Sequence, residues 1–559
     1  MEQRVRDVLK VGDKLFDNKR TVDALWQEIA LNFHPTRATF TEKRDDGDEY
    51  SDHLFSSYPS MARRELGNML AEFLRPDKFF SIHVDDEDLD EAEEERAFLE
   101  RLTDIQWRAM SDPVARLVTS AGAADHDFAT FGNAVEWFGL NVAGDALLFR
   151  TYHLRDNAWA ENGEGLIDFN NRNWDPTARQ LVHYFKDKVS KKVKDAYDKD
   201  PEHTFPCRHV VLPARMYPFK SKAGKAFPFV SLYVERETDT LLEEVGLSHF
   251  PYVISRWQHV AGSQYGRSMT TDVLLPDGRT LQVVMRTLRE AGEMHVNPSL
   301  LAVTEAIRGD IGLYPGGITT ISAEYDERMG EALRPLARDK SGFPIGSEIA
   351  TALKEDIRHG WLLDKIQLPE SNAKMTATEV RRRTQEHIRA AAPITKPIQR
   401  ERNYPMCDGV FQLLRENGAF PIPDMPASLA KKQIKFKFRS PLDDLADQNL
   451  AEVYLDNRDR ILMPAIQIDP SLKEMVDLEE STREALRANG WKAKWFKPKE
   501  AVAAAREELA AEQEAQGVMQ DLAAAGQVAE QGGKGIDSLV NAGANAMGGV
   551  PPQQGVPVR

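Results

Sequence analysis

Residues 275–298 read LPDGRTLQVVMRTLREAGEMHVNP. Asn297-Pro298 closes this stretch, because proline cannot continue a helix. We therefore predict a helix from Pro276 of roughly 18 residues, which would be about 27 Å long. Its apolar residues recur at spacings of three and four, the period of one helix face: Leu281, Val284, Met285 and Leu288.

A second helix is predicted over residues 347–365, so two helices enclose an insertion, residues 299–346, that is rich in glycine and proline. The insertion contains one strand candidate, at residues 318–324. No catalytic signature accompanies this arrangement. It indicates a helix-walled conduit rather than an active site.

A polar loop and an abrupt helix start come next. The loop, residues 367–375, leads into MTATEVRRR, residues 375–383. Thr376 and Glu379 fit a capping box, in which each side chain satisfies a backbone N–H at the start of a helix. This cap defines where the loop ends and where the following helix begins.

The chain has 559 residues, more than one hydrophobic core usually organises, so two or more domains are expected. Its apolar runs are too short to cross a bilayer and no signal-peptide core is apparent, so we expect no membrane role. A formal net charge of -16 argues against a surface that grips nucleic acid broadly. It is compatible with DNA that slides past, because a negative lumen would repel the duplex.

Outside this region the chain mixes helical and strand patterns. An apolar stripe from Val22 to Phe33 stops at His34-Pro35 and predicts a helix. Later segments rich in β-branched and aromatic residues are separated by turn residues, which is typical of antiparallel hairpins, so the predicted fold class is α+β. Further helices are expected at 59–74, 127–139, 177–197, 406–417 and 498–525, and another helical region is expected to end at residue 488. Strands are expected at 146–155, 166–170, 207–216, 228–237, 251–258, 434–438 and 461–468.

The acidic run at residues 85–95 allows two interpretations. It could be a cation site or a DNA mimic. A solvated helix start, whose carboxylates favour the positive end of the helix dipole, is the better supported interpretation.

Candidate metal ligands are few. Cys207 and Cys407 lie far apart, and His203 and His209 beside the first do not complete a zinc pattern. The triplet Asp125-His126-Asp127 could supply ligands, but adjacent helical residues point in different directions, so a ligand role is disfavoured.

Catalytic motifs are also missing. Gly532-Gly533-Lys534-Gly535 lacks the context and the hydroxyl of a phosphate-binding loop, and residues 262–266 are not a dinucleotide fingerprint. Neither HExxH nor GxSxG occurs. We therefore expect no catalytic, cofactor-binding or metal-binding residues, no cofactor, and no enzyme activity.

A series of short motifs runs in order along the chain. They are Trp26 with Pro35; Pro76 with Phe79-Phe80; Asp127-Phe128 with Phe131-Gly132; Asp175 to Gln180; His209 to Pro213; Arg256-Trp257 through Ser268; Asn297-Pro298; and Met375 to Val380. Each is weak alone. Their order over roughly residues 20–500 resembles the portal proteins, or head-to-tail connectors, of tailed bacteriophages, in the form found in short-tailed phages.

The resemblance implies a portal fold that assembles as a ring of twelve subunits at one capsid vertex. Its stem and crown would be mainly helical, its wing mixed α/β with antiparallel strands, and its clip small and α/β. In this sequence the implied parts are the wing (1–274 and 376–468), two stem helices (275–297 and 347–366), the clip (298–346), the tunnel loop (367–375), the crown (469–531) and a flexible C-terminal tail (532–559).

The resemblance also implies functional residues. Lys374, the basic residue of the implied loop, could touch DNA phosphates transiently, and a merely solvated lysine is the alternative. The clip residues implied in partner docking are Tyr314, Tyr325 and Arg328. The implied DNA-channel residues are Gln367, Glu370, Ser371, Asn372 and Lys374, followed by the helix cap of Thr376 and Glu379.

The implied function is a channel for packaging and ejecting double-stranded DNA and a docking platform for the terminase motor and the tail. The expected partners are further copies of the chain, the terminase large subunit, tail adaptor and nozzle proteins, and the major capsid and scaffolding proteins. The protein would be assembled in the host cytoplasm and reside at the portal vertex of the virion. Two alternatives stay open: a cytosolic multidomain enzyme acting on nucleic acid or phosphorylated substrates, and a different virion ejection protein.

Overall fold

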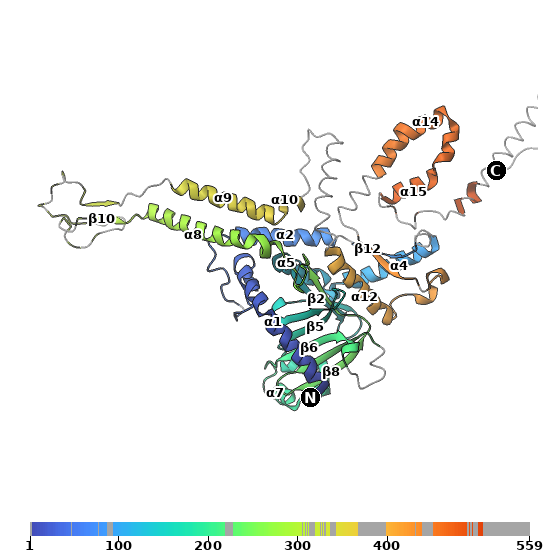
Figure 1. Ribbon diagram of the computed structural model, residues 1–559, viewed down its shortest axis with the longest axis horizontal. Helices are drawn as coiled ribbons and strands as arrows, with labels where there is room; N and C mark the ends of the chain where they lie inside the picture. Colours follow the sequence, from blue (N-terminus) through green and yellow to red (C-terminus); the bar gives the residue numbers. More distant parts are fainter. Residues whose placement is uncertain are drawn as a thin grey trace, which may run out of the picture. The chain divides into compact units, whose positions relative to one another are not determined.

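The computed structural model of the chain has two compact units, residues 1–489 and residues 490–559. In the first unit, helices combine with antiparallel sheets, which confirms the predicted α+β class (Figure 1). The structure describes residues 3–45, 47–75, 78–86, 93–217, 227–303, 342–366, 398–430, 432–438 and 451–488, with scattered positions in 306–335 and 491–506.

The larger sheet is antiparallel, with strand order β4-β5-β6-β7-β8. All residues of its central strand β6 are buried. The sequence predicts the three inner strands, whereas the two edge strands escape prediction. The strands are β4 (Asn157–Glu161), β5 (Ile167–Trp174), β6 (Cys207–Pro213), β7 (Phe229–Glu235) and β8 (Thr240–Leu247).

The smaller sheet, with strand order β3-β2-β9, corrects the helix predicted over 127–139. The helix ends earlier, because Gly132 adopts a φ of 70°, a left-handed conformation that glycine tolerates without strain. Beyond it Val135 and Phe138 are buried in the central strand, which suits β-branched and aromatic residues. The elements are α5 (Leu117–Phe131), β2 (Asn133–Leu140), β3 (Leu147–Tyr152) and β9 (Tyr252–Arg256).

Helix α1 (Gln3–Phe33) packs against the larger sheet, and α2 (Tyr58–Leu74) packs against α5. Helix α1 ends where His34-Pro35 predicts, and α2 confirms the second predicted helix. Trp26 of α1 is 1% exposed and its ring meets those of Phe131 and Trp159, so α1 shares one apolar core with α5 and the larger sheet.

The helix predicted over 177–197 is two helices, α6 (Ala178–Phe185) and α7 (Lys191–Lys199). Lys186 adopts a φ of 50° directly after α6, which breaks the helix. The hydroxyl of Ser190 then accepts a hydrogen bond from the Val193 N–H at 3.3 Å and caps α7. Propensity alone did not reveal this break.

A second apolar core joins segments from both halves of the chain. The predicted strand 434–438 is confirmed as β12, which pairs antiparallel with β1. The predicted helix 406–417 is confirmed as α12, and Gly418 follows it with a φ of 68°. The elements are β1 (Phe80–Val84), α4 (Glu93–Ser111), α12 (Tyr404–Glu416) and β12 (Ile434–Phe438).

The described part of the acidic run makes intramolecular contacts. Asp85 pairs with Lys435, and Asp86 Oδ2 lies 2.8 Å from Lys432 Nζ. Helix α4 begins at the end of the run. These contacts favour the helix-start interpretation over a cation site or DNA mimic. Residues 87–92 lie outside the described part of the chain.

The strand predicted over 461–468 is wrong. The π-helical turn η12 (Arg458–Leu462) and helix α14 (Met463–Ile468) occupy this stretch. A short apolar run does not distinguish strand from helix by periodicity, and Pro464 fits a first helical turn better than a sheet ladder. Helix α15 (Leu478–Ala488) confirms the helical region predicted to end at residue 488. Most of the predicted helix 498–525 lies beyond what the structure describes.

Candidate functional site: a helical hairpin and its anchors

The two helices that enclose the insertion form a hairpin. Helices α8 (Leu275–Val296) and α9 (Gly342–Gly360) lie side by side, and α10 (Leu363–Ile366) follows (Figure 1). Gly346 contacts Leu288 and Gly360 contacts Leu274, so the two helices run antiparallel. The first predicted helix is confirmed. The second, predicted over 347–365, is two helices, because α9 ends at Gly360 and Leu362 adopts a φ of 58° before α10 begins.

The root of the hairpin is fixed in the core of the first unit. Gln282 Oε1 accepts hydrogen bonds from the N–H groups of Phe55 and Ser56, both at 2.8 Å, and its Nε2 donates to Ser56 O at 3.0 Å. Gly278 lies so close to Phe33 that a Cβ would be 2.6 Å from the ring. The rings of Phe33 and Trp361 meet edge to face at 5.8 Å. The first turns of α8 and the end of α9 are thereby immobilised.

Beyond this root the hairpin exposes apolar side chains. Val283 and Val296 of α8 are 64% and 89% exposed. Phe343, Ile345 and Ile349 of α9 are also exposed. Contiguous exposed apolar side chains mark interaction surfaces in soluble proteins. The exposed apolar side chains make the outer part of the hairpin a candidate interaction surface.

A short ribbon lies within the insertion. Strands β10 (Leu300–Ala302) and β11 (Leu333–Pro335) pair antiparallel, and all three residues of β10 are exposed. Of the residues expected to dock partners, Arg328 is exposed, and its N–H donates to Asp326 Oδ1 at 2.9 Å. Tyr314 and Tyr325 lie outside the described residues.

The expected channel residues also fall outside the described part of the chain, but both flanks of this segment are described. Before it, Trp361 is fully buried and Leu363 is 2% exposed. After it, Ile398 is 1% exposed and Arg402 is fully buried. Both ends of segment 367–397 are thus held in the core. The residues that the structure leaves undescribed are Gln367, Glu370, Ser371, Asn372, Lys374, Thr376 and Glu379.

Arg402 anchors the chain where it returns from this segment. Its Nε donates to Glu136 Oε2 at 2.6 Å, its Nη1 binds Asp125, and its Nη2 donates to Ala121 O at 3.0 Å. Arg75 also pairs with Asp125. Burial alone would lower the pKa of Arg402, but the two carboxylates raise it, so the guanidinium stays charged.

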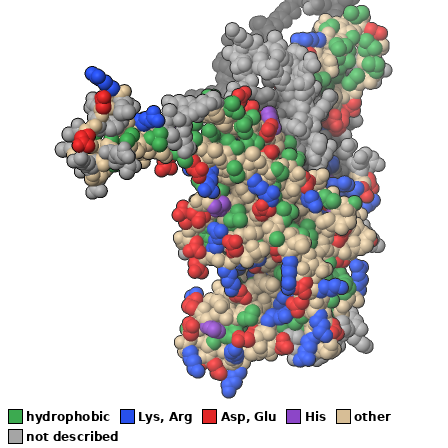
Figure 2. All heavy atoms as spheres, turned by 60° about the vertical axis from the view of Figure 1, so that its left-hand side comes forward, with side chains coloured by type: hydrophobic (Ala, Val, Ile, Leu, Met, Phe, Trp, Pro, Cys, Tyr) green, Lys and Arg blue, Asp and Glu red, His purple; other side chains and the backbone are tan. Residues whose placement is uncertain are grey.

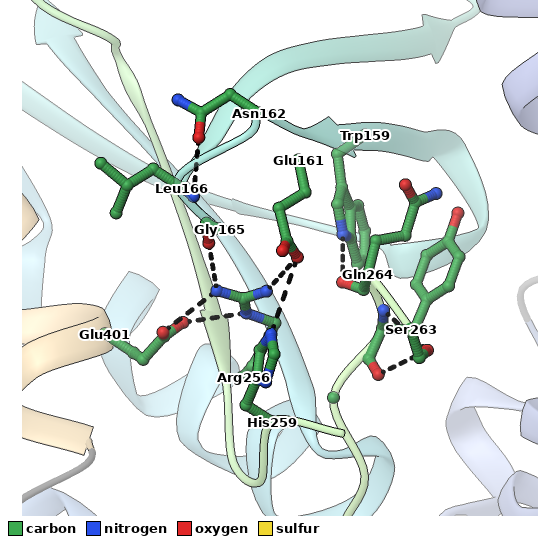
Figure 3. A network of polar contacts seen from close by, with 12 residues as sticks. Trp159, Glu161, Asn162, Gly165, Leu166, Arg256, His259, Ser263, Gln264 and Glu401 are labelled. Atoms are coloured by element: carbon green, nitrogen blue, oxygen red, sulfur yellow. Dashed lines mark hydrogen bonds and ion pairs between the residues drawn. The ribbon is translucent and has the colours of Figure 1, made fainter. Parts of the chain in front are cut away.

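The neighbouring residue Glu401 makes a second anchor, shown in Figure 3. Its carboxylate accepts two hydrogen bonds from Arg256, at 3.1 Å each. Arg256 also donates to Glu161 at 2.6 Å and to Gly165 O at 3.1 Å. His259 Nε2 lies 3.8 Å from the Glu161 carboxylate. Adjacent residues of one turn therefore bind different strands, Glu401 the end of β9 and Arg402 the middle of β2, and no local sequence pattern indicates either partner.

Each of three π-helical turns is followed by a proline. The turns η7 (Thr270–Leu274), η9 (Gln399–Asn403) and η12 immediately precede helices with Pro276, Pro405 and Pro464 in their first turn. Proline donates no hydrogen bond and its ring crowds the carbonyl four residues earlier, so a wider turn relieves the clash. The first two turns lead into the hairpin and out of segment 367–397.

The acidic triplet has a structural role. Asp125 binds Arg75 and Arg402, whereas Asp127 accepts two hydrogen bonds from Arg37, at 2.8 and 2.6 Å. As expected for adjacent helical residues, the two carboxylates point to different partners. The described residues contain no group of three acidic, His or Cys side chains suited to a metal ion.

The surface charges and helices add two observations. On the face that Figure 2 shows, acidic and basic side chains are interspersed rather than gathered by sign. Among the residues that the structure describes, no helix is both long and apolar enough to cross a membrane.

Comparison with known proteins assigns the family. Residues 6–496 match the family model of bacteriophage head to tail connecting proteins, and the chain belongs to this family. It is 21% identical over 564 residues to the portal protein of Salmonella phage epsilon15, with 98% of each chain covered. It is 23% identical over 441 residues to the probable portal protein of Bordetella phage BPP-1, with 75% of each covered.

These relationships confirm the resemblance to portal proteins, and the function of the chain is that of a phage portal. The family is structural, so the enzyme alternative is not favoured. Phage portal proteins are components of the virion.

Proposed function

We propose that twelve copies of this chain form a closed ring at one capsid vertex, and that double-stranded DNA passes through its centre during packaging and ejection. The α8–α9 hairpin is the observation that supports this proposal most strongly. Its root is fixed in the core, while Val283, Ile345 and Ile349 are exposed beyond it. Two helices cannot cover these side chains by themselves, because each helix buries only the stripe that faces its neighbour. Adjacent copies in a ring can cover them.

In this assignment, α8 and α9 are the stem, and β10 and β11 belong to the clip. A two-stranded ribbon is marginally stable in water, so the exposed β10 is expected to pair with neighbouring copies. The proposed parts are the wing (1–274 and 376–468), stem (275–297 and 347–366), clip (298–346), tunnel loop (367–375), crown (469–531) and C-terminal tail (532–559).

We further propose that residues 367–375 face the DNA. Both flanks of segment 367–397 are held in the core, at Trp361 and at Arg402, so the points where this segment leaves and rejoins the core are fixed. One basic side chain per subunit, Lys374, is a weak phosphate contact that permits sliding. The net charge of -16 likewise disfavours tight adhesion of DNA to the channel.

The ring acts without catalysis of its own, so a separate ATPase, the terminase large subunit, supplies the energy for packaging. The clip would receive this motor and later the tail adaptor and nozzle proteins, with exposed Arg328 among the contacting residues, together with Tyr314 and Tyr325. The wing would contact the major capsid and scaffolding proteins. Assembly in the host cytoplasm precedes incorporation into the virion.

Negative-stain electron microscopy of the purified full-length chain tests ring assembly. The wild type should form rings, and the double substitution Ile345→Asp with Ile349→Asp should reduce them, because charges would enter an apolar contact. Val142→Asp is the matched control, since Val142 is 57% exposed in the turn between β2 and β3. A monodisperse wild-type monomer at every concentration and salt tested would contradict the proposal.

Deletion of residues 367–375 tests the loop. Ring assembly should survive, because both flanks keep their own anchors, whereas DNA packaging or retention should fall in a packaging assay with the cognate motor. If the deletion abolishes rings instead, the loop is a contact between subunits. Lys374→Ala separates the charge from the loop itself, and equal packaging by this variant would assign Lys374 to solvent.

A further inference from the structure

A buried arginine with two nitrogens that are unpaired among the described residues lies where α2 packs against α5. Arg63 is 7% exposed, and its Nε and Nη1 atoms are buried with no hydrogen-bond partner among the described residues. Nδ1 of His126 and Oγ of Ser60 are likewise buried with no hydrogen-bond partner among the described residues. Gly67 brings the α2 backbone against the His126 ring, where an added Cβ would lie 2.1 Å from Nδ1. Unsatisfied polar atoms are thus concentrated in this helix contact.

The charges around Arg63 do not balance. Asp127 attracts Arg63, but both of its oxygens already bind Arg37. Burial and then the charge of Arg63 lower the pKa of His34 and of His126, so both imidazoles are neutral at pH 7. Burial lowers the pKa of Arg63 to about 10, which leaves it protonated. Two guanidinium groups therefore share one carboxylate.

The nearby anchor of Arg402 shows the contrast. There two guanidinium groups, of Arg75 and Arg402, face two carboxylates, of Asp125 and Glu136. That cluster is neutral and its ion pairs are formed. Burial of an unpaired charge is unfavourable unless a counter-charge accompanies it. Among the described residues, the contact around Arg63 has one carboxylate, Asp127, for two guanidinium groups.

We propose that a small inorganic anion, such as chloride, binds between α2 and α5 against Arg63. The Nε and Nη1 groups of Arg63 donate to it, and the Ser60 hydroxyl, three residues earlier on the same helix, supplies a further donor. These groups are hydrogen-bond donors of the kind that an anion requires. The bound anion supplies the missing negative charge and stabilises the packing of α2 on α5. This site is independent of ring assembly.

Thermal unfolding of the full chain tests the site, with chloride replacing gluconate at constant ionic strength. An anion that binds only the folded state raises Tm with saturable concentration dependence. The wild type and the control Arg64→Gln, which alters an exposed neighbour, should show this rise. Arg63→Gln should show at least tenfold weaker apparent affinity. Equal chloride dependence in the two variants, or none in the wild type, would overturn the proposal.

A second measurement does not depend on a variant that folds. Bromide replaces chloride and scatters anomalously, so wild-type crystals grown in bromide should show an anomalous peak within hydrogen-bond distance of Arg63 Nε or Nη1. An ordered water at that position, without anomalous signal at saturating bromide, would show that hydration alone satisfies Arg63.

Discussion

The hydroxyl of Tyr252 lies 2.6 Å from Nδ1 of His209. Tyr252 belongs to β9 of the smaller sheet and His209 to β6 of the larger, so this contact joins the two sheets. Nε2 of His209 lies 2.8 Å from the hydroxyl of Ser231, and the ring stacks on Tyr233 with centroids 3.9 Å apart. Burial, and then the charge of Arg172, lower the pKa of His209 well below its ordinary value. The neutral imidazole donates through one nitrogen and accepts through the other.

Tyr252→Phe should destabilise the protein by about 1–3 kcal/mol, because it leaves a buried imidazole nitrogen without a partner. Urea unfolding at pH 7 measures this change. Tyr184→Phe is the matched control, since Tyr184 is 43% exposed, and should cost less than about 0.5 kcal/mol. Equal effects of the two substitutions would show that the contact between the sheets contributes nothing.

Stability should fall as the pH decreases below about 6.5. Burial lowers the folded-state pKa of His34, His153 and His209, to about 2 for His153, so the unfolded chain binds more protons than the folded protein over this range. Their full contribution is present above pH 6.5 and is lost towards the folded-state pKa. Each histidine should account for about 2 kcal/mol between pH 7 and pH 5.

The pH effect is assigned by comparing two variants. His209→Gln should reduce the change in unfolding free energy between pH 7 and pH 5 by about 2 kcal/mol, the contribution of one histidine. This holds whatever effect the substitution has on stability at pH 7. The exposed His183 provides the control variant His183→Gln, which should leave the dependence unchanged. A His209→Gln variant with the wild-type pH profile would contradict a neutral buried imidazole.

Arg402→Met should destabilise the first unit by about 3–5 kcal/mol, because it leaves Asp125 and Glu136 buried with one fewer cation. Arg400→Met, two residues earlier and exposed, removes the same charge without this effect. Denaturant unfolding compares the two. Similar stability of both variants would mean that the buried ion pairs of Arg402 do not stabilise the returning chain.

Gly278→Ala should lift α8 from α1, because its Cβ would lie 2.6 Å from the Phe33 ring. The expected cost is about 1–3 kcal/mol, as for other overpacked contacts. Gly292→Ala in the same helix meets nothing within 4 Å and should stabilise the helix by about 0.5–1 kcal/mol. Thermal unfolding should show a lower Tm for Gly278→Ala and a higher Tm for Gly292→Ala.

Residues that terminate helices explain which element boundaries could be predicted from the sequence. His34-Pro35, Asn297-Pro298 and Gly418 follow the ends of α1, α8 and α12 because proline and positive φ terminate a helix regardless of its surroundings. The two wrong elements, at 127–139 and 461–468, contain apolar runs that suit either structure. In the first segment, pairing with β3 and β9 favours a strand. In the second, the π-helical turn η12 favours a helix.

The amino-acid sequence by itself determined the α+β class, the two helices that enclose the insertion and the resemblance to portal proteins, because periodicity and ordered motifs are properties of the chain that need no partner. Only the tertiary structure decided the anchors. Arg402 reaches Glu136 across 266 residues and Arg256 reaches Glu401 across 145. Such ion pairs form only when folding brings segments that are distant in the chain together, and that event leaves no pattern in the local sequence.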